Sequence, residues 1–214
     1  MPAFALARAA YKPDVQFVEV QILKLLSCTN LLAGTVEVVI YITSRDSRMT
    51  NHETVVGRAN EADLDGILAL QEANQMARGG LLSANLPRDR VAAMMQEMPL
   101  IVARRDGRIT GFLMTTTRGM NADLPIVQAM FAAYHGTPDA YVYGPICVGE
   151  EERGKGLAQR MFAVLRDFEQ RREGVLFIRK DNGPSLRAHL KMGMKEVACF
   201  PFNGFDFAVY SYIG

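Results

Sequence analysis

The stretch Val148-Gly-Glu-Glu-Glu-Arg-Gly-Lys-Gly-Leu-Ala158 separates two segments of different pattern. Residues 141–148 form an apolar, β-rich run, and after the stretch apolar residues recur with helical spacing at Leu157, Met161, Val164, Leu165 and Phe168. A strand that turns through glycine into a helix leaves the first N–H groups of that helix without internal partners, and the helix dipole adds positive charge there. Gly154 and Gly156 also let the main chain approach a bulky anion closely. The stretch therefore predicts a pyrophosphate-binding site.

One pattern in this stretch, Gly149-x-x-x-x-Gly154-Lys155, matches most of the Walker A loop of nucleoside triphosphatases. That loop continues with a Ser or Thr hydroxyl that binds magnesium, and here the next residue is Gly156. The consecutive carboxylates at 150–152 would also repel a polyphosphate. The stretch therefore disfavours a nucleoside triphosphatase.

A second pattern, Arg153-x-x-Gly156-x-Ala158, resembles the acetyl-CoA loop of the GNAT family of N-acetyltransferases, Arg/Gln-x-x-Gly-x-Gly/Ala. A further motif follows a short apolar run at 175–178. The family pattern there is Asn-x-x-Ala-x-x-(apolar)-Tyr-x-Lys-x-Gly-Phe, and the residues at matching offsets are Asn182, Ser185, Ala188, Lys191 and Gly193. The chain departs from the pattern twice, with His189 in place of Tyr and Met194 in place of the closing aromatic residue. The two motifs occur in the right order, which supports the resemblance. It covers the chain from about Thr54 to the C-terminus.

The resemblance implies an α/β (α+β) fold, the acyl-CoA N-acyltransferase fold. Its sheet is mixed and mostly antiparallel, it is flanked by helices, and the order of elements is βααβββαβαββ. The sequence is consistent with that order. Strands are expected at 54–58, 100–103, 109–116, 141–148, 175–178, 196–202 and 205–212, and helices at 62–74, 88–97, from 157 and from 185. Asp106-Gly107 and Asn203-Gly204 predict hairpin turns, and the long segment 118–139 has room for a short helix.

The first 48 residues do not belong to this pattern. We expect residues 1–48 to be an N-terminal extension, either dispensable or non-native with Met49 as the true initiator, and residues 49–214 to be the N-acetyltransferase domain. The apolar-rich part of the extension, 15–42, is interrupted by Glu19, Lys24 and Glu37, so it contains no uninterrupted span of bilayer length. A secretory signal is also poorly supported, because no clean apolar region precedes a small-residue cleavage site.

The composition limits the class of protein. The chain has 214 residues, 49% of them hydrophobic and 22% charged, and a formal net charge of +1, which fits one globular domain. A near-neutral chain has no electrostatic affinity for nucleic acid or anionic membranes. Its cysteines and histidines are scattered, so they predict neither a disulfide framework nor a metal site (Cys28, Cys147, Cys199, His52, His135 and His189). We expect a cytoplasmic monomer or homodimer.

The family resemblance also implies how acetyl-CoA is bound. The backbone of Cys147 and Val148 would pair with the pantetheine arm, and Pro145, which lacks an N–H, suits the separation of strands that admits the cofactor. The pyrophosphate would lie on the loop formed by Arg153, Gly154, Lys155, Gly156, Leu157 and Ala158. Asn182 and Ser185 would contact the cofactor nearer the thioester.

His189 is the candidate catalytic residue, because it stands where the family has the tyrosine that donates a proton to the coenzyme A sulfur. The alternative is a histidine that only packs within its helix. Tyr141 or Tyr143 could serve instead if the fold presents either of them to the sulfur. The general base is open: Glu72, Glu150 or a chain of water molecules could accept the amine proton. A nucleophilic Cys147 is disfavoured, since a cysteine in a strand is usually a small buried hydrophobe.

The expected function is therefore acetyl-CoA-dependent transfer of an acetyl group, by direct attack, to a primary amine of a small molecule or amino-acid derivative. The segments that would form the acceptor pocket, 71–85 and 118–143, are rich in Met and aromatic residues and poor in acids, which disfavours a polyamine. Two other classes stay open: a non-catalytic acyl-CoA-binding module, and an interaction domain that keeps only the fold. Ligand-induced stabilisation separates binders from non-binders, and release of the coenzyme A thiol separates an enzyme from a binder.

Overall fold

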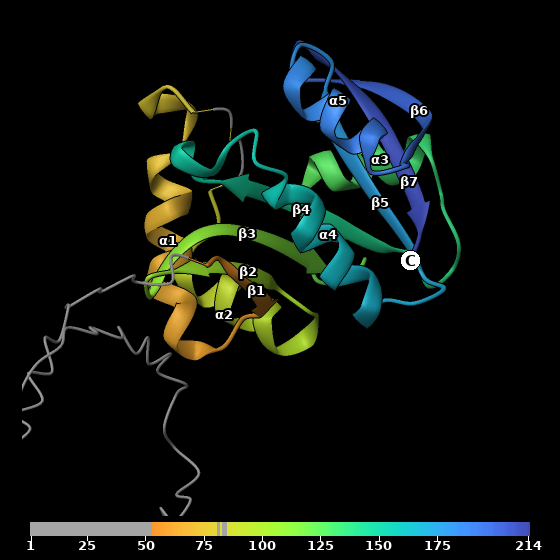
Figure 1. Ribbon diagram of the computed structural model, residues 1–214. Coiled ribbons are helices and arrows are strands. Elements are labelled where there is room, and N and C mark those ends of the chain that lie inside the picture. Colours follow the sequence, from red (N-terminus) through yellow and green to blue (C-terminus); the bar gives the residue numbers. More distant parts are fainter. Residues whose placement is uncertain (1–52, 81, 83–84) are drawn as a thin grey trace, which may run out of the picture. The chain divides into compact units, whose positions relative to one another are not determined.

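The computed structural model describes residues 53–80, 82 and 85–214 of the chain. The expected extension at 1–48 and the expected start at Met49 lie outside the described residues. The described residues form one seven-stranded sheet of order β1-β2-β3-β4-β5-β7-β6, with helices on both faces (Figure 1). All neighbouring strands are antiparallel except β4 and β5, so the sheet is mixed and mostly antiparallel, as predicted.

The helices and strands follow the predicted order with one addition. The strands are β1 (Val55–Arg58), β2 (Ile101–Arg105), β3 (Arg108–Thr116), β4 (Tyr141–Val148), β5 (Glu173–Arg179), β6 (Lys195–Phe202) and β7 (Phe205–Ile213). The α-helices are α1 (Leu64–Ala73), α2 (Arg88–Glu97), α3 (Pro125–Ala133), α4 (Leu157–Phe168) and α5 (Gly183–Lys191). Single 3-10 turns lie at Glu61–Asp63, Met76–Arg78 and Glu150–Glu152. Helix α3 is absent from the predicted order; it begins with Pro125 in its first turn, where proline is well tolerated.

The two hairpin turns are confirmed at the residues that predicted them. Asp106 and Gly107 have φ values of 52° and 74°, and Asn203 and Gly204 have values of 47° and 80°. Consecutive left-handed residues form the turn whose twist matches that of the two strands it joins, and Asp, Asn and Gly adopt this conformation most easily.

Each face of the sheet has its own core. On one face, α4 packs over the central strands through Leu157, Met161, Phe162 and Leu165, which are buried against side chains of β2, β3, β4, β5 and β7. On the other face, the first two helices cover β2 and β3, and α3 covers the start of β4 together with β5, β6 and β7. Because side chains alternate along a strand, neighbouring residues of β4 and β5 contribute to opposite cores.

Strands β4 and β5 separate soon after they begin. Only Tyr141 with Gly174 and Val142 with Val175 are paired across them, although both strands continue for several residues (Figure 1). On its other edge, β4 stays paired with β3 as far as Val148, with a bulge at Gly144–Pro145. The separation opens a gap in the middle of the sheet, and the candidate site lies there.

Candidate functional site

A cleft of about 570 Å³ occupies the gap between β4 and β5. On the face covered by α4 and α5, its lining includes Tyr143, Leu176, Ile178, Asn182, Ser185 and His189. From the opposite face come Asn85, Asn121, Leu124, Val127, Phe177 and Arg179. The cleft therefore connects the two faces of the sheet, and two molecules that enter from opposite sides can meet within it.

The glycine loop lies at the end of β4, just beyond the cleft. Gly154 and Gly156 both have a φ of 77°, a conformation that other residues adopt only with strain. Gly156 is the N-cap of α4, and no side chain caps the helix, so its first N–H groups are left for a ligand. A Cβ atom at Gly154 would meet nothing within 4 Å, and one at Gly156 would meet only the side chain of Gln159, at 3.9 Å. The loop thus presents backbone donors and open space, as an anion site requires.

The acidic residues of this loop do not have a common role. Glu150 and Glu151 are exposed, but Glu152 is only 6% exposed and contacts Arg105 of β2 at 2.5 Å and Lys155 at 3.5 Å. Its hydrogen bond to the Arg105 guanidinium lowers the pKa of the Glu152 carboxyl. Glu152 thus ties the loop to the sheet, a role that the sequence did not reveal because its partner Arg105 is distant along the chain.

Arg153 also stabilises the loop. Its Nη2 donates to the Oδ1 of Asn74 at 2.6 Å, and its Nε donates to the carbonyl of Val148 at 3.3 Å. Asn74 follows the last residue of α1, so Arg153 connects the loop to the end of that helix. Lys155 and Arg153 both have partners within the protein, and the backbone donors of the loop make up the main part of the candidate anion site.

The backbone groups of β4 alternate between its two edges. The N–H of Gly149 donates to the carbonyl of Thr110 at 2.8 Å, so Gly149 is hydrogen-bonded to β3. In an antiparallel pair the hydrogen-bonded residues alternate, so the backbone of Cys147 also faces β3, whereas the backbone of Val148 and Ile146 faces the open edge. Of the two residues expected to pair with a cofactor arm, Val148 has its backbone at the open edge of β4 and Cys147 has its backbone toward β3. The Cys147 thiol is buried on the side of α1 and α2, and burial raises its pKa to about 12, which makes it a poor nucleophile.

Asn182 and Ser185 lie together at the start of α5. The Oδ1 of Asn182 accepts a hydrogen bond from the N–H of Ser185 at 3.2 Å, so Asn182 is the N-cap of the helix. This bond orients the Asn182 side chain and leaves its Nδ2 as a donor. Both residues line the cleft.

His189 lies one turn further along α5 and is only 2% exposed. Its Nδ1 lies 2.8 Å from the carbonyl oxygen of Ser185, and because a carbonyl can only accept, Nδ1 carries the proton. Its Nε2 is buried and has no hydrogen-bond partner among the described residues. Burial lowers the pKa of His189, and the bond to Ser185 opposes this in part. At neutral pH the imidazole is therefore neutral, with a free acceptor atom at the cleft.

Tyr143 lies beside His189, with its ring centroid 5.7 Å from that of the imidazole and nearly perpendicular to it. The Tyr143 hydroxyl is buried and, within the described residues, has no hydrogen-bond partner. Burial raises its pKa, so it stays protonated and acts as a donor. A buried donor and a buried acceptor, each unpaired, thus line the same part of the cleft. Unpaired buried groups cost free energy, and a bound ligand that pairs with them would offset that cost.

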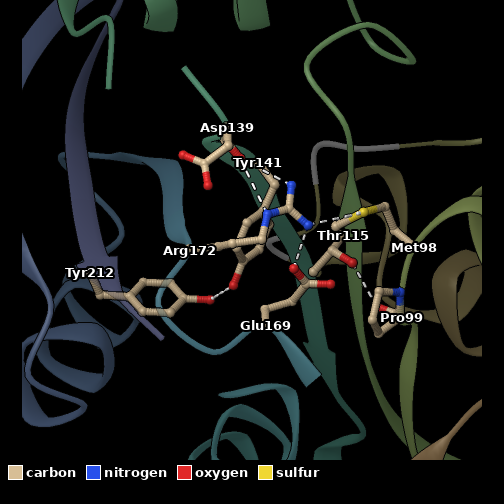
Figure 2. A network of polar contacts seen from close by, with 8 residues as sticks. All are labelled: Met98, Pro99, Thr115, Asp139, Tyr141, Glu169, Arg172 and Tyr212. Carbon is tan, nitrogen blue, oxygen red and sulfur yellow. Dashed lines mark hydrogen bonds and ion pairs between the residues drawn. The ribbon is translucent and has the colours of Figure 1, made fainter. Parts of the chain in front are cut away.

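Tyr141, two residues earlier on β4, has a structural role. Its hydroxyl bonds to that of Tyr212 on β7, and Arg172 lies over its ring with its guanidinium carbon 5.3 Å from the centroid (Figure 2). Arg172 also contacts Glu169 at 2.5 Å and donates to the carbonyl of Asp139 at 3.0 Å. This network joins the closed ends of β4, β5 and β7, and Tyr141 does not line the cleft.

Neither candidate general base reaches the cleft. Glu72 is exposed on α1 and forms an ion pair with Arg78, and Glu150 is exposed on the loop. Within the described residues, no carboxylate lines the cleft, and no cluster of His, Cys, Asp or Glu side chains is arranged to hold a metal ion. None of the described helices has the length and hydropathy to cross a bilayer.

Comparison with known proteins finds one family whose model matches the sequence and solved structures that share the fold. A family model described as "Acetyltransferase (GNAT) family" matches residues 69–194. No curated protein matches the sequence. Among solved structures, a GNAT-family acetyltransferase of Streptococcus agalactiae shares 16% identity with a TM-score of 0.58, the match covering 75% of this chain and 95% of that one. An N-acetyltransferase of Staphylococcus aureus shares 21% identity with a TM-score of 0.53 and covers 75% and 98%. The yncA protein of Salmonella typhimurium, solved with its cofactor acetyl-CoA, shares 16% identity with a TM-score of 0.55 and covers 75% and 94%.

Proposed function

Because the chain belongs to the GNAT acetyltransferase family, whose members use acetyl-CoA, we propose that it transfers an acetyl group to a primary amine of a small molecule or amino-acid derivative. The observation that carries this proposal is the cleft between β4 and β5, in which the buried Nε2 of His189 and the buried hydroxyl of Tyr143 both lack partners among the described residues. A domain that kept only the fold would have no use for two costly unpaired groups at this place.

The residues at the open edge of β4 are suited to hold acetyl-CoA, which supplies an activated thioester. The loop from Arg153 to Ala158 offers backbone donors to the pyrophosphate. The backbone of Val148 and Ile146 offers hydrogen bonds to the pantetheine arm. Asn182 offers its Nδ2 and Ser185 its hydroxyl near the middle of the cleft.

His189 and Tyr143 have complementary roles in this proposal. The sequence-based hypothesis made His189 a proton donor, but the protonated Nδ1 is bonded to Ser185 and the free Nε2 can only accept. His189 Nε2 therefore takes the proton that the attacking amine releases, and returns it to the departing sulfur. Tyr143 donates a hydrogen bond to the charge that develops on the sulfur, without losing its own proton, since its pKa is raised. A fixed acceptor and donor of this kind each contribute about 10²-fold or more to a rate.

The second candidate function is a non-catalytic acyl-CoA-binding module. It is favoured by the two departures from the family motif, His189 and Met194. The second departure has a structural explanation, because Met194 is buried in the core beneath α4 and α5, where it fills space as an aromatic residue would. Only the departure at His189 bears on the choice between enzyme and binder.

Two measurements test the proposal in sequence. In a thermal-shift titration, acetyl-CoA should raise the melting temperature with increasing concentration, because a ligand of the folded state stabilises it. A screen of primary amines should then release the coenzyme A thiol in step with formation of the acetylated amine. Binding without acetylation of any amine would favour the non-catalytic module, and the absence of binding would contradict both candidates.

A further inference from the structure

Asn121 contributes an unpaired polar atom on the face of the cleft opposite α5. It lies in the turn between β3 and α3, is 5% exposed and lines the cleft. Its Nδ2 donates to the Oγ1 of Thr116 at 2.9 Å, which holds the amide in place. Its Oδ1 is buried and has no partner among the described residues. A fixed, unpaired carbonyl oxygen in a cavity is an acceptor for the N–H group of a ligand.

Arg179 is the one charged side chain in the described lining of the cleft. It lies on the same face of the sheet as Asn121, because side chains alternate along β5: Val175, Phe177 and Arg179 point to one face, and Ile178 points to the other. Its guanidinium carbon lies 4.7 Å from the ring centroid of Phe205, and its Nε donates to the exposed carboxylate of Asp181 at 2.5 Å. Among the described residues that is its only hydrogen bond to another side chain, so its terminal nitrogens are available to a carboxylate.

The rest of this half of the cleft is mostly apolar, with Asn85 as a further uncharged polar side chain. Its walls are formed by side chains of the turn after α1, of α3, and of the β6–β7 hairpin (Met76, Leu82, Leu124, Ile126, Phe202 and Phe207). Gln71 holds one wall in position, because its side-chain amide bonds to both the N–H and the carbonyl of Leu86, at 3.1 and 2.9 Å. An apolar wall with one cation and no carboxylate disfavours a polycationic ligand and suits an apolar body with one anionic group.

We propose that this half of the cleft binds the acceptor substrate, and that the acceptor is an apolar amino acid. The Oδ1 of Asn121 accepts a hydrogen bond from the amine and holds it toward His189, the guanidinium of Arg179 binds the carboxylate, and the apolar walls bind the side chain. This inference rests on the proposed acetyltransferase activity, which supplies the acetyl group. One N–C bond forms and the C–S bond of the thioester breaks, while the amine proton passes to the sulfur.

The first test compares amines that differ only in the carboxylate. L-Phenylalanine, L-methionine and 5-aminopentanoate are each assayed against their decarboxylated counterparts, with spermidine as the polycation. We expect each amino acid to have a kcat/KM at least tenfold higher than its counterpart, because a charge-assisted hydrogen bond is lost with the carboxylate. A preference for the decarboxylated amines or for spermidine would overturn the inference while leaving the acetyltransferase function intact. If acetyl-CoA binds and no amine is acetylated, the proposed function itself fails.

The second test uses variants of the two residues. Arg179→Gln should raise KM for the amino acid about tenfold or more and leave KM for the decarboxylated amine within a factor of two. Arg179→Lys should restore part of the difference. Asn121→Leu should raise KM for both amines about tenfold, because it removes the acceptor for the amine; it also breaks the bond to Thr116, so its melting temperature is compared with that of Thr116→Val. Thr116→Val breaks the same Asn121–Thr116 bond but keeps Oδ1, so it should have the smaller effect on KM.

Acetyl-CoA binding, measured by thermal shift, should be unchanged in all of these variants, since none of the altered residues belongs to the cofactor half of the cleft. Equal losses of affinity for an amino acid and its decarboxylated counterpart in Arg179→Gln would refute the carboxylate site. An Asn121→Leu protein with an unchanged KM would refute the amine site.

Discussion

Replacing Tyr143 with Phe should make the protein more stable and the enzyme slower. The hydroxyl of Tyr143 is buried and has no partner in the described part of the chain, so it contributes its desolvation cost without a compensating bond. An unpaired buried polar group costs about 1–3 kcal/mol. Removing the hydroxyl should recover about 1 kcal/mol, and for a domain of this size that corresponds to a rise of about 2–4 °C in Tm. The same change removes the proposed donor to the departing sulfur, which should lower kcat about 10²-fold.

Tyr141→Phe is the matched control, because Tyr141 lies on the same strand and loses the same atom. Its hydroxyl is bonded to that of Tyr212, so the substitution leaves the Tyr212 hydroxyl buried and unpaired and should destabilise the protein by about 1–3 kcal/mol. Since Tyr141 does not line the cleft, kcat should stay within a factor of two. Thermal unfolding without ligand and steady-state kinetics with a saturating amine measure both effects. A Tyr143→Phe protein that is less stable, or whose kcat equals that of the wild type, would refute the roles given to this hydroxyl.

Substitutions at three further positions test the loop and α5. The Asp and Asn side chains of Gly156→Asp and Gly156→Asn have nearly the same shape and place the same strain on a left-handed residue. The Asp variant should bind acetyl-CoA about tenfold more weakly than the Asn variant, because its charge repels the pyrophosphate, and the difference should shrink as the salt concentration rises. Equal affinities in the two variants would argue against the anion site. His189→Ala should lower kcat about 10²-fold with little change in acetyl-CoA binding, and His189→Tyr should restore part of the rate. Because burial depresses the pKa of His189 below 6.5, the limb of the wild-type kcat/KM profile that belongs to His189 should lie below that pH, apart from the ionisation of the amine itself, and a limb that persists there in both His189 variants would assign it to another group. Arg105 lowers the pKa of Glu152 below 4.5, so the stability that Glu152 contributes is present above that pH and is lost as the pH falls. The difference in Tm between the wild type and Glu152→Gln should therefore vanish in acid. A difference that is constant with pH would contradict the ion pair.

The parts of this fold that could be predicted from the sequence are those that depend on neighbours in the chain. The turns at Asp106-Gly107 and Asn203-Gly204 and the glycine loop before α4 each have a local conformational cause, and all three lie where expected. Helix α3 lies in the segment 118–139 that was expected to have room for a short helix, but its bounds were not predicted, because it has a first-turn proline and no capping side chain and its start carries a weak local signal.

The site itself depends on residues that are distant in sequence. No local pattern reveals that Glu152 pairs with Arg105, that Arg153 reaches Asn74, or that the Oδ1 of Asn121 lacks a partner. The alternation of a strand shows that Tyr141 and Tyr143 share one face, but only the separation of β4 from β5 distinguishes the tyrosine that bonds to Tyr212 from the one that lines the cleft. The family motif identifies His189 as a proton donor to the sulfur, and the hydrogen bond from its Nδ1 to Ser185 adds a preceding role, because Nε2 is then free to accept the amine proton.

The most direct test of the central claim is acetyl transfer within this cleft, measured on one reaction mixture by two methods. The full chain is incubated with acetyl-CoA and L-phenylalanine, and the released thiol and the mass of the amino acid are followed together. We predict that thiol release and N-acetylphenylalanine rise in equal amounts with the wild type, and that both fall about 10²-fold with His189→Ala. Thiol release without an acetylated amine, or equal rates for the two proteins, would contradict the account.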